Sequence, residues 1–267
     1  EILPSDWSSD VCSSDLVILF TLCSSVANAE GKGMGEIETS GNEVAHDKRT
    51  RIAAFDYDGT IISGQSGALF ASYLFSRGYL KLARALRLGW WGARYVLHLP
   101  YRQGEAREQV FSALSEHTPE EVHRIMMDFH DEVLLRRYRQ EAIREIGRRK
   151  REGCTILLVS ATFKDIAQRA VRITGADDFV ATGMELDANG NYTGNVDGAV
   201  IAGPEKTRAV IGWANEHIGA DAWTIAYSYA DHHSDADLLA ASEKAYAVTP
   251  GKALRLKAKR QHWQVLN

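Results

Sequence analysis

Residues 51–60 read RIAAFDYDGT, a short apolar run that leads directly into two aspartates, a glycine and a threonine. The apolar run predicts a buried strand over residues 51–55, and Gly59 permits a tight turn immediately after it. Asp56 and Asp58 are therefore expected at the carboxyl end of a strand. In open parallel sheets ligands bind at this end, so the stretch predicts both the type of fold and the position of a site.

Two different patterns follow this strand. Residues 68–151 show apolar side chains at three- and four-residue spacing, which predicts helices throughout, and Thr118, Pro119 and Glu121 predict that a long helix begins there. After Gly153, segments typical of strands alternate with helical segments, which indicates a parallel sheet covered by helices on both faces. The expected strands are 155–159, 179–182, 223–227 and 245–248, the expected helices are 164–173, 204–217 and one from residue 235, and 187–195 is expected to form a hairpin turn.

These patterns predict an α/β protein with a Rossmann-like parallel sheet core and an inserted helical cap. We expect residues 51–66 and 152–267 to form the core and residues 67–151 to form the cap. The 267 residues, 45% of them hydrophobic, suit one mid-sized domain with an insertion or two small domains that share a site. A net charge of -4 disfavours a general nucleic-acid binder, and the three cysteines show no spacing typical of zinc sites or disulfide frameworks.

The first fifty residues are expected to be a leader that is not part of the fold. Residues 6–16 read DWSSDVCSSDL, which resembles the translation of a sequencing adapter, so we expect residues 1–33 not to be native and Met34 to be the start. Residues 34–50 are polar and are expected to be disordered. The alternative is a secretory signal, since an apolar run over 16–26 precedes Ala27-Asn28-Ala29. We expect a cytoplasmic protein, with export as the alternative.

Residues with catalytic chemistry are expected at one edge of the sheet, because each follows an expected strand or opens a helix there. They are Asp56 and Asp58, Ser160-Ala161-Thr162, Lys206, and Asp231 with Asp235. Attack on a phosphate monoester needs a nucleophile, a proton donor for the leaving oxygen and positive charge near the transferring group. Several carboxylates at one place are costly unless a hard cation joins them, so Mg²⁺ is the expected cofactor.

With these motifs, residues 51–267 resemble the haloacid dehalogenase superfamily, in subfamily IB near the phosphoserine phosphatases, which carries a helical cap. The resemblance implies that Asp56 forms an aspartyl-phosphate and that Asp58 acts first as an acid and then as a base. It also implies that Ser160 hydrogen-bonds the phosphoryl oxygens and that Lys206 neutralises charge. For Mg²⁺, the resemblance implies binding by Asp56, Asp231 and the backbone carbonyl of Asp58, with Asp235 in support of the site. For the substrate, it implies binding by Gly59, Thr60, Ala161 and Thr162.

Each of these residues also has an ordinary structural interpretation. Ser160 could cap the following helix, Asp231 could belong to a turn, and a lysine in the first turn of a helix, such as Lys206, is usually solvated. His232 and His233 suggest a transition-metal site, but no other cluster of histidine or cysteine accompanies them. The order and spacing of the motifs together favour the catalytic interpretation.

The predicted function is magnesium-dependent hydrolysis of a phosphomonoester that is a small organic or lipid-like molecule. The alternatives are a phosphotransferase and a degenerate protein that keeps the fold for binding or membrane association. Carbon–halogen hydrolysis is disfavoured because it would need only the nucleophile. Phosphoserine is disfavoured as the substrate, because the relatives that bind its ammonium group have glutamate where this chain has Gln65.

The cap carries a basic and aromatic segment. Its members are Lys81, Arg84, Arg87, Arg94 and Arg102, interleaved with Trp90, Trp91 and Tyr95. Such a segment is usually the solvated face of an amphipathic helix. The alternative is a surface near the site entrance that suits an anionic or lysophospholipid-like phosphomonoester, or peripheral contact with a membrane.

Overall fold

The computed structural model describes residues 49–83, 86–87, 89–90, 94 and 105–267. The predictions for residues 1–48 therefore lie outside the described residues, as do those for Arg84, Trp91, Tyr95 and Arg102.

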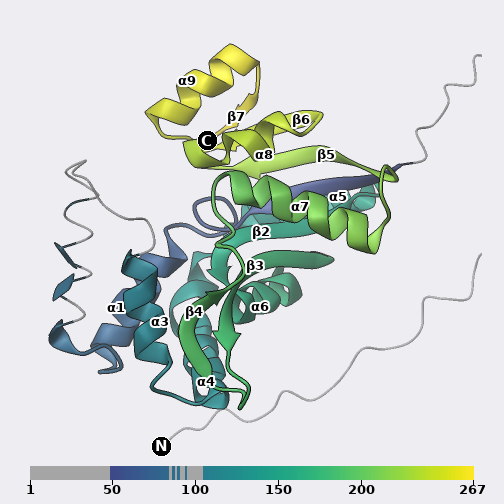
Figure 1. Cartoon of the computed structure of the whole chain (residues 1–267). Coiled ribbons are helices and arrows are strands. Elements are labelled where there is room, and N and C mark those ends of the chain that lie inside the picture. The colour runs from purple at the N-terminus through teal and green to yellow at the C-terminus, as the bar shows by residue number, and fades with distance from the viewer. Residues whose placement is uncertain (1–48, 84–85, 88, 91–93, 95–104) are drawn as a thin grey trace, which may run out of the picture. The chain divides into compact units, whose positions relative to one another are not determined.

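A seven-stranded sheet forms the centre of the described fold, with the strands in the order β4-β3-β2-β1-β5-β6-β7 (Figure 1). All neighbouring strands are parallel except β3 and β4, which are antiparallel. The strands are β1 (Thr50–Asp56), β2 (Thr155–Phe163), β3 (Asp178–Leu186), β4 (Tyr192–Asp197), β5 (Trp223–Ala230), β6 (Lys244–Val248) and β7 (Gln264–Leu266). The predicted α/β fold is confirmed, and the expected hairpin turn joins β3 to β4.

Strand β1 lies between β2 and β5 and is buried on both faces. Ala53 and Phe55 belong to the larger hydrophobic cluster, whereas Ile52 and Ala54 belong to a second cluster across the sheet. Side chains alternate between the two faces of a strand, so the apolar run at residues 52–55 supplies both clusters at once. Burial on both faces holds the end of β1, and with it Asp56, in one position.

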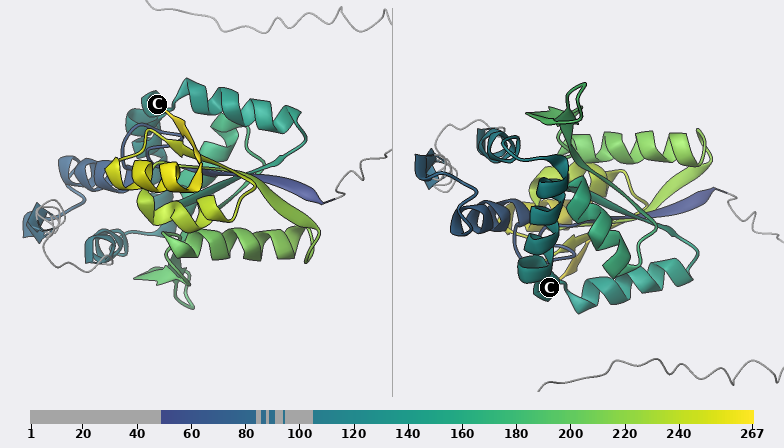
Figure 2. Two further views of the ribbon diagram at one scale, coloured as in Figure 1. Left: turned by 90° about the horizontal axis from the view of Figure 1, so that it is seen from above. Right: turned by 90° about the horizontal axis from the view of Figure 1, so that it is seen from below.

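Helices cover both faces of the sheet (Figure 2). Ile146 of α5 and Ile166 of α6 pack in the larger cluster, and Val210 of α7 and Leu238 of α8 pack in the second. The helices are α1 (Ser66–Ser76), α3 (Glu105–Leu114), α4 (Pro119–Phe129), α5 (Gln140–Arg151), α6 (Lys164–Thr174), α7 (Pro204–His217), α8 (Ala236–Ala240) and α9 (Lys252–Gln261). A π-helix at His130–Leu134 and short 3-10 helices at Leu135–Arg137 and His233–Asp235 complete the described elements.

The described residues between β1 and β2 form no strand, as the sequence predicts. The expected capping box begins α4, because the Thr118 side chain accepts a hydrogen bond from the Glu121 backbone and the Glu121 side chain accepts one from Thr118. Helix α3 contacts β4 and α4 contacts α6. Helix α5, which the predicted cap of residues 67–151 includes, packs on the sheet. No helix among the described residues is long and apolar enough to cross a bilayer.

Candidate active site

Lys206 lies at the centre of a buried ionic group. It is in the first turn of α7, and its Nζ donates to Asp56 Oδ1 at 2.6 Å and to Asp235 Oδ2 at 2.8 Å. The three residues are only 5%, 3% and 2% exposed, respectively. The interpretation of Lys206 as a solvated lysine is therefore wrong. Burial lowers the pKa of Lys206, but Asp56 and Asp235 outweigh that effect and raise the pKa above its ordinary value, so the lysine remains charged.

Asp231 joins Asp56 and Asp235, and each of the three offers a carboxylate oxygen within 4.8 Å of the others. Burial raises the pKa of Asp56 well above its ordinary value, Lys206 opposes that effect, and Asp235 and Asp231 add to it. Burial and then Asp235 raise the pKa of Asp231 to about 6. One lysine thus faces three carboxylates, and the excess negative charge and the oxygen donors fit a hard divalent cation.

Gly59 allows the loop after β1 to approach Asp231. Its φ is +70°, and a Cβ atom at this position would lie 1.9 Å from Asp231 Oδ2, closer than any non-bonded contact. Only glycine therefore fits both the backbone conformation and the neighbouring carboxylate.

Asp58 faces a different partner from the other carboxylates. Its Oδ1 accepts from the Ser66 backbone N–H at 2.6 Å, and its Oδ2 accepts from Ser66 Oγ at 3.0 Å. The Asp58 carboxylate is thus held at the start of α1, outside the group of three carboxylates. The metal ligand expected at this residue is its backbone carbonyl, and that stays a prediction. Burial raises the pKa of Asp58 despite the opposing hydrogen bonds from Ser66, which favours a carboxyl that holds a proton.

Ser66 is a site residue that the sequence analysis missed. It is buried, and besides Asp58 it contacts Thr162, since its Oγ lies 3.1 Å from Thr162 Oγ1. The available signal was its place at the start of an expected helix, eight residues after Asp58.

Ser160 and Thr162 are buried where β2 changes register against β3. Ser160 Oγ accepts from the Thr162 backbone N–H at 3.0 Å. The interpretation of Ser160 as a helix cap is wrong, because Phe163 occupies the N-cap of α6. Ala161 lies between them on β2. Through Thr162 and Ser66, this end of β2 is connected to Asp58.

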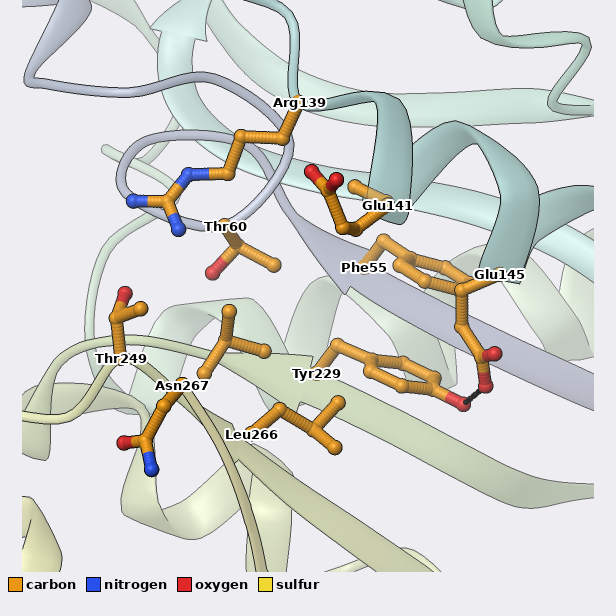
Figure 3. A pocket seen from close by; sticks show the side chains of 11 residues that line it. Phe55, Thr60, Arg139, Glu141, Glu145, Tyr229, Thr249, Leu266 and Asn267 are labelled. Carbon is orange, nitrogen blue, oxygen red and sulfur yellow. Dashed lines mark hydrogen bonds between the residues drawn. The ribbon is translucent and has the colours of Figure 1, made fainter.

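Thr60 lies apart from these groups. Its side chain lines a cavity together with Phe55 and Tyr229, and none of the three grouped carboxylates lines that cavity (Figure 3). His232 and His233 contact each other in a tilted arrangement, with 4.1 Å between ring centroids and 49° between the ring planes, and His232 Nδ1 accepts from the Ser234 backbone N–H at 3.3 Å. Neither histidine belongs to the group of possible metal ligands found in the described part of the chain.

The comparison with family models matches residues 53–240 to the haloacid dehalogenase-like hydrolases. The matched segment is most of the chain and contains every residue of the ionic group, Asp58 and Ser160. The chain belongs to the haloacid dehalogenase-like hydrolase family, as its sequence resemblance implied.

Two curated relatives match most of the chain. An inhibition of morphological differentiation protein from Streptomyces azureus is 25% identical over 83% of this chain and 80% of its own length. A histidinol-phosphatase from Neisseria meningitidis serogroup C (strain 8013) is 23% identical over 81% of this chain and 98% of its own length.

Solved structures share the fold. A protein with unknown function from Bordetella pertussis Tohama I has a TM-score of 0.74 and 26% identity, and the match covers 82% of this chain and 99% of that one. A phospho-aspartyl intermediate analogue of phosphoserine phosphatase has a TM-score of 0.56 and 16% identity over 82% and 93% of the two chains. The α/β fold with a largely parallel sheet is therefore that of the phosphoserine phosphatase neighbours.

Proposed function

We propose that this protein is a magnesium-dependent phosphomonoester hydrolase that works through a covalent aspartyl-phosphate on Asp56. The observation that carries the proposal is the separation of two carboxylates on one loop. Asp56 sits in the ionic group beside Lys206, whereas Asp58 is held by Ser66 outside it. In this proposal Lys206 and a bound cation keep Asp56 ionised as the nucleophile, whereas Asp58, which contacts neither, serves as the proton carrier.

The proposed reaction has two steps. In the first, a carboxylate oxygen of Asp56 attacks phosphorus, the bond from phosphorus to the leaving oxygen breaks, and Asp58 gives its proton to that oxygen. In the second, Asp58 takes a proton from water as the water oxygen attacks the aspartyl-phosphate, which releases inorganic phosphate and restores Asp56. In this reaction Lys206 offsets the negative charge of the phosphoryl group, and Ser160 donates a hydrogen bond to its oxygens.

Mg²⁺ fits the donor set formed by Asp56, Asp231 and Asp235. When bound, it would neutralise carboxylate and phosphoryl charge at this place. Gly59 supports this assignment, since the absence of a side chain there leaves room for Asp231.

We infer a small organic or lipid-like phosphate as the substrate. The histidinol-phosphatase relative and the phosphoserine phosphatase neighbours support a small phosphomonoester. The cap supports a lipid-like group, because Leu82, Leu86 and Trp90 follow one another at four-residue spacing and all three are about two-thirds exposed. Arg87 is exposed in the same segment, and its positive charge suits a substrate with an anionic leaving group.

A turnover assay on a generic aryl phosphate tests the proposal. We expect phosphate release that requires Mg²⁺ and stops with a chelator, and no release from Asp56→Asn. Asp221→Asn, an exposed aspartate replaced in the same way, is the matched control and should keep full activity. Transfer of the phosphoryl group to an added alcohol in preference to water would indicate a phosphotransferase instead, and activity on chloroacetate would indicate a dehalogenase.

A further inference from the structure

The cavity that Thr60 lines is on the opposite face of β1 from Asp56. Consecutive residues of a strand point to opposite faces, so Phe55, which lines this cavity, faces away from the carboxylates. The cavity holds about 150 Å³. Its lining comes from Phe55, Thr60, Arg139, Glu141, Ala142, Glu145, Tyr229, Val248, Thr249, Leu266 and Asn267.

Two hydrogen-bond donors at this cavity lack an acceptor among the described residues. Thr60 is 2% exposed, and its Oγ1 has no partner there. Arg139 Nε is likewise buried without a partner, and no ion pair of Arg139 is found within the described part of the chain. Figure 3 shows the Arg139 guanidinium and the hydroxyls of Thr60 and Thr249 on the same side of the cavity. Buried donors are normally satisfied, so this side of the cavity is suited to an acceptor.

The acidic side chains of the lining are already engaged. Glu145 accepts from the Tyr229 hydroxyl at 2.5 Å and pairs with Arg148 and Arg149, each at 2.9 Å. Glu141 pairs with Arg144 at 3.0 Å. Glu141 and Arg139 attract each other, but neither Glu141 nor Glu145 forms an ion pair or a hydrogen bond with Arg139 among the described contacts. The guanidinium therefore keeps donors for an anionic acceptor.

The other walls of the cavity are apolar and suit a compact apolar group of a ligand. Phe55 and Tyr229 stack with 4.2 Å between ring centroids, and Val248 and Leu266 also line the cavity. An apolar cavity of ~150 Å³ is large enough for benzene. A ligand with one anionic end and one ring-sized or branched apolar end would match both halves of the lining.

We propose that this cavity is a binding site for a small hydrophobic carboxylate, with the carboxylate on Arg139 and Thr60 and the apolar part against Tyr229, Val248 and Leu266. The planar guanidinium matches the fork of a carboxylate. A singly charged carboxylate is also repelled less by Glu141 and Glu145 than a doubly charged phosphate would be. The site shares no lining residue with the group formed by Asp56, Asp231 and Asp235.

Binding of benzoate to the full chain, measured by calorimetry and by ligand-observed NMR, tests this site. Benzyl alcohol has nearly the same shape without the charge, and inorganic phosphate has the charge without the ring. We expect benzoate to bind, benzyl alcohol to bind at least about tenfold more weakly, because the charge-assisted hydrogen bonds are lost, and phosphate not to displace benzoate.

Two variants locate the benzoate. Arg139→Gln should weaken benzoate binding by about tenfold or more, whereas Arg136→Gln, an exposed arginine of the same segment, should not. Ala142→Leu places a larger side chain in the wall and should abolish binding. Both cavity variants should keep the thermal midpoint and the aryl phosphatase activity of the native chain, which shows that they fold. Equal binding of benzoate and benzyl alcohol, displacement by phosphate, or unchanged affinity in folded Arg139→Gln would each overturn the proposal.

Discussion

Gly59 and Lys206 show how single residues shape the candidate site. Lys206 bridges Asp56 and Asp235, which come from the ends of two different segments, and so joins the loops after β1 and β5. Gly59 contributes by lacking a side chain, because Asp231 occupies the space that a Cβ would fill. The charge of Lys206 and the missing side chain of Gly59 thus both help to position the same group of carboxylates.

Gly59→Ala should inactivate the enzyme while leaving it folded. The added Cβ would push Asp231 away from the ionic group, and a displacement of about 1 Å at a catalytic group can cost ~100-fold in rate. We therefore expect kcat/KM on an aryl phosphate to fall at least about 100-fold.

Gly78→Ala is the matched control for this prediction. Gly78 also has a positive φ, +79°, but a Cβ there meets nothing within 4 Å. The control should lose a little stability and no activity. Similar activity losses in the two variants would show that backbone strain, and not contact with Asp231, explains the result.

The residues of the ionic group could be predicted from sequence, whereas Ser66 and the contacts that it makes could not. Asp56, Lys206 and Asp235 each follow a strand or open a helix at the same edge of the sheet, which is a local signal. Ser66 gains its importance only by donating to Asp58 at the start of α1, and the same Ser66 hydroxyl contacts Thr162. These contacts depend on the path of the chain from β1 into α1, and no spacing in the sequence specifies that path.

At the scale of elements, the end of the cap departs from the regular helix that the apolar spacing predicts. A π-helix follows α4 directly, and a 3-10 helix follows it, before α5 begins. His130, which is fully buried at this change, binds Tyr138 Oη through Nε2 at 2.9 Å, and Tyr138 in turn contacts the Tyr57 hydroxyl at 3.0 Å. Apolar periodicity continues through both kinds of helix, so it could not reveal the irregular segment.

The buried His130 should make folding stability depend on pH. Burial lowers the pKa of His130 below its ordinary value of 6.5, despite the opposing hydrogen bond to Asp131. The unfolded chain therefore takes up a proton at this residue before the folded chain does, and the free energy of unfolding should fall as pH falls below about 6.5.

Urea unfolding of the native chain and of His130→Gln at several pH values between about 7.5 and 5.5 measures this contribution. The glutamine variant should be less stable at neutral pH but should lose less stability on acidification. The exposed His262, replaced by asparagine, should leave the pH dependence of the native chain unchanged. A slope that is equally steep without His130 would assign the pH dependence to other groups.

At the scale of the whole described fold, α5 is tied to the sheet by a buried arginine. Arg149 Nε donates to the Tyr229 hydroxyl at 2.7 Å, its Nη2 donates to the Tyr246 hydroxyl at 3.0 Å, and its guanidinium lies 3.7 Å from the centroid of Tyr227. These contacts connect the helix that precedes β2 with β5 and β6. The joined segments lie far apart in the sequence.

Arg149→Met should destabilise the protein by about 3 kcal/mol, because it leaves the buried hydroxyls of Tyr229 and Tyr246 without their donor and removes one of the two arginines that pair with Glu145. Its neighbour Arg148 carries the same charge but has a side chain that is 51% exposed, so Arg148→Met should cost less than about 1 kcal/mol. Equilibrium unfolding in urea compares the two. Equal losses would mean that the charge on α5, and not the buried contacts of Arg149, supports the fold.

The sequence predicted the type of fold but not all of its arrangement. The expected strands near residues 51–55, 155–159, 179–182, 223–227 and 245–248 are all present, because each is a short apolar run between turn signals. Strand β7 was missed, since Gln264–Leu266 is short and exposed and pairs only through the backbone with β6. The order of the strands also depends on contacts between distant segments, which local patterns do not contain.

The most direct test of the proposed mechanism is whether a phosphoryl group becomes attached to Asp56 during turnover. Acid quenching of the enzyme with an aryl phosphate and Mg²⁺, followed by proteolysis and mass spectrometry, locates the modified residue. We expect phosphate on the peptide that contains Asp56, in greater amount in Asp58→Asn, because hydrolysis of the intermediate loses its base, and none in Asp56→Asn. Turnover by the native enzyme with the phosphate on another residue, or with no phosphate on Asp56 in Asp58→Asn, would contradict the account.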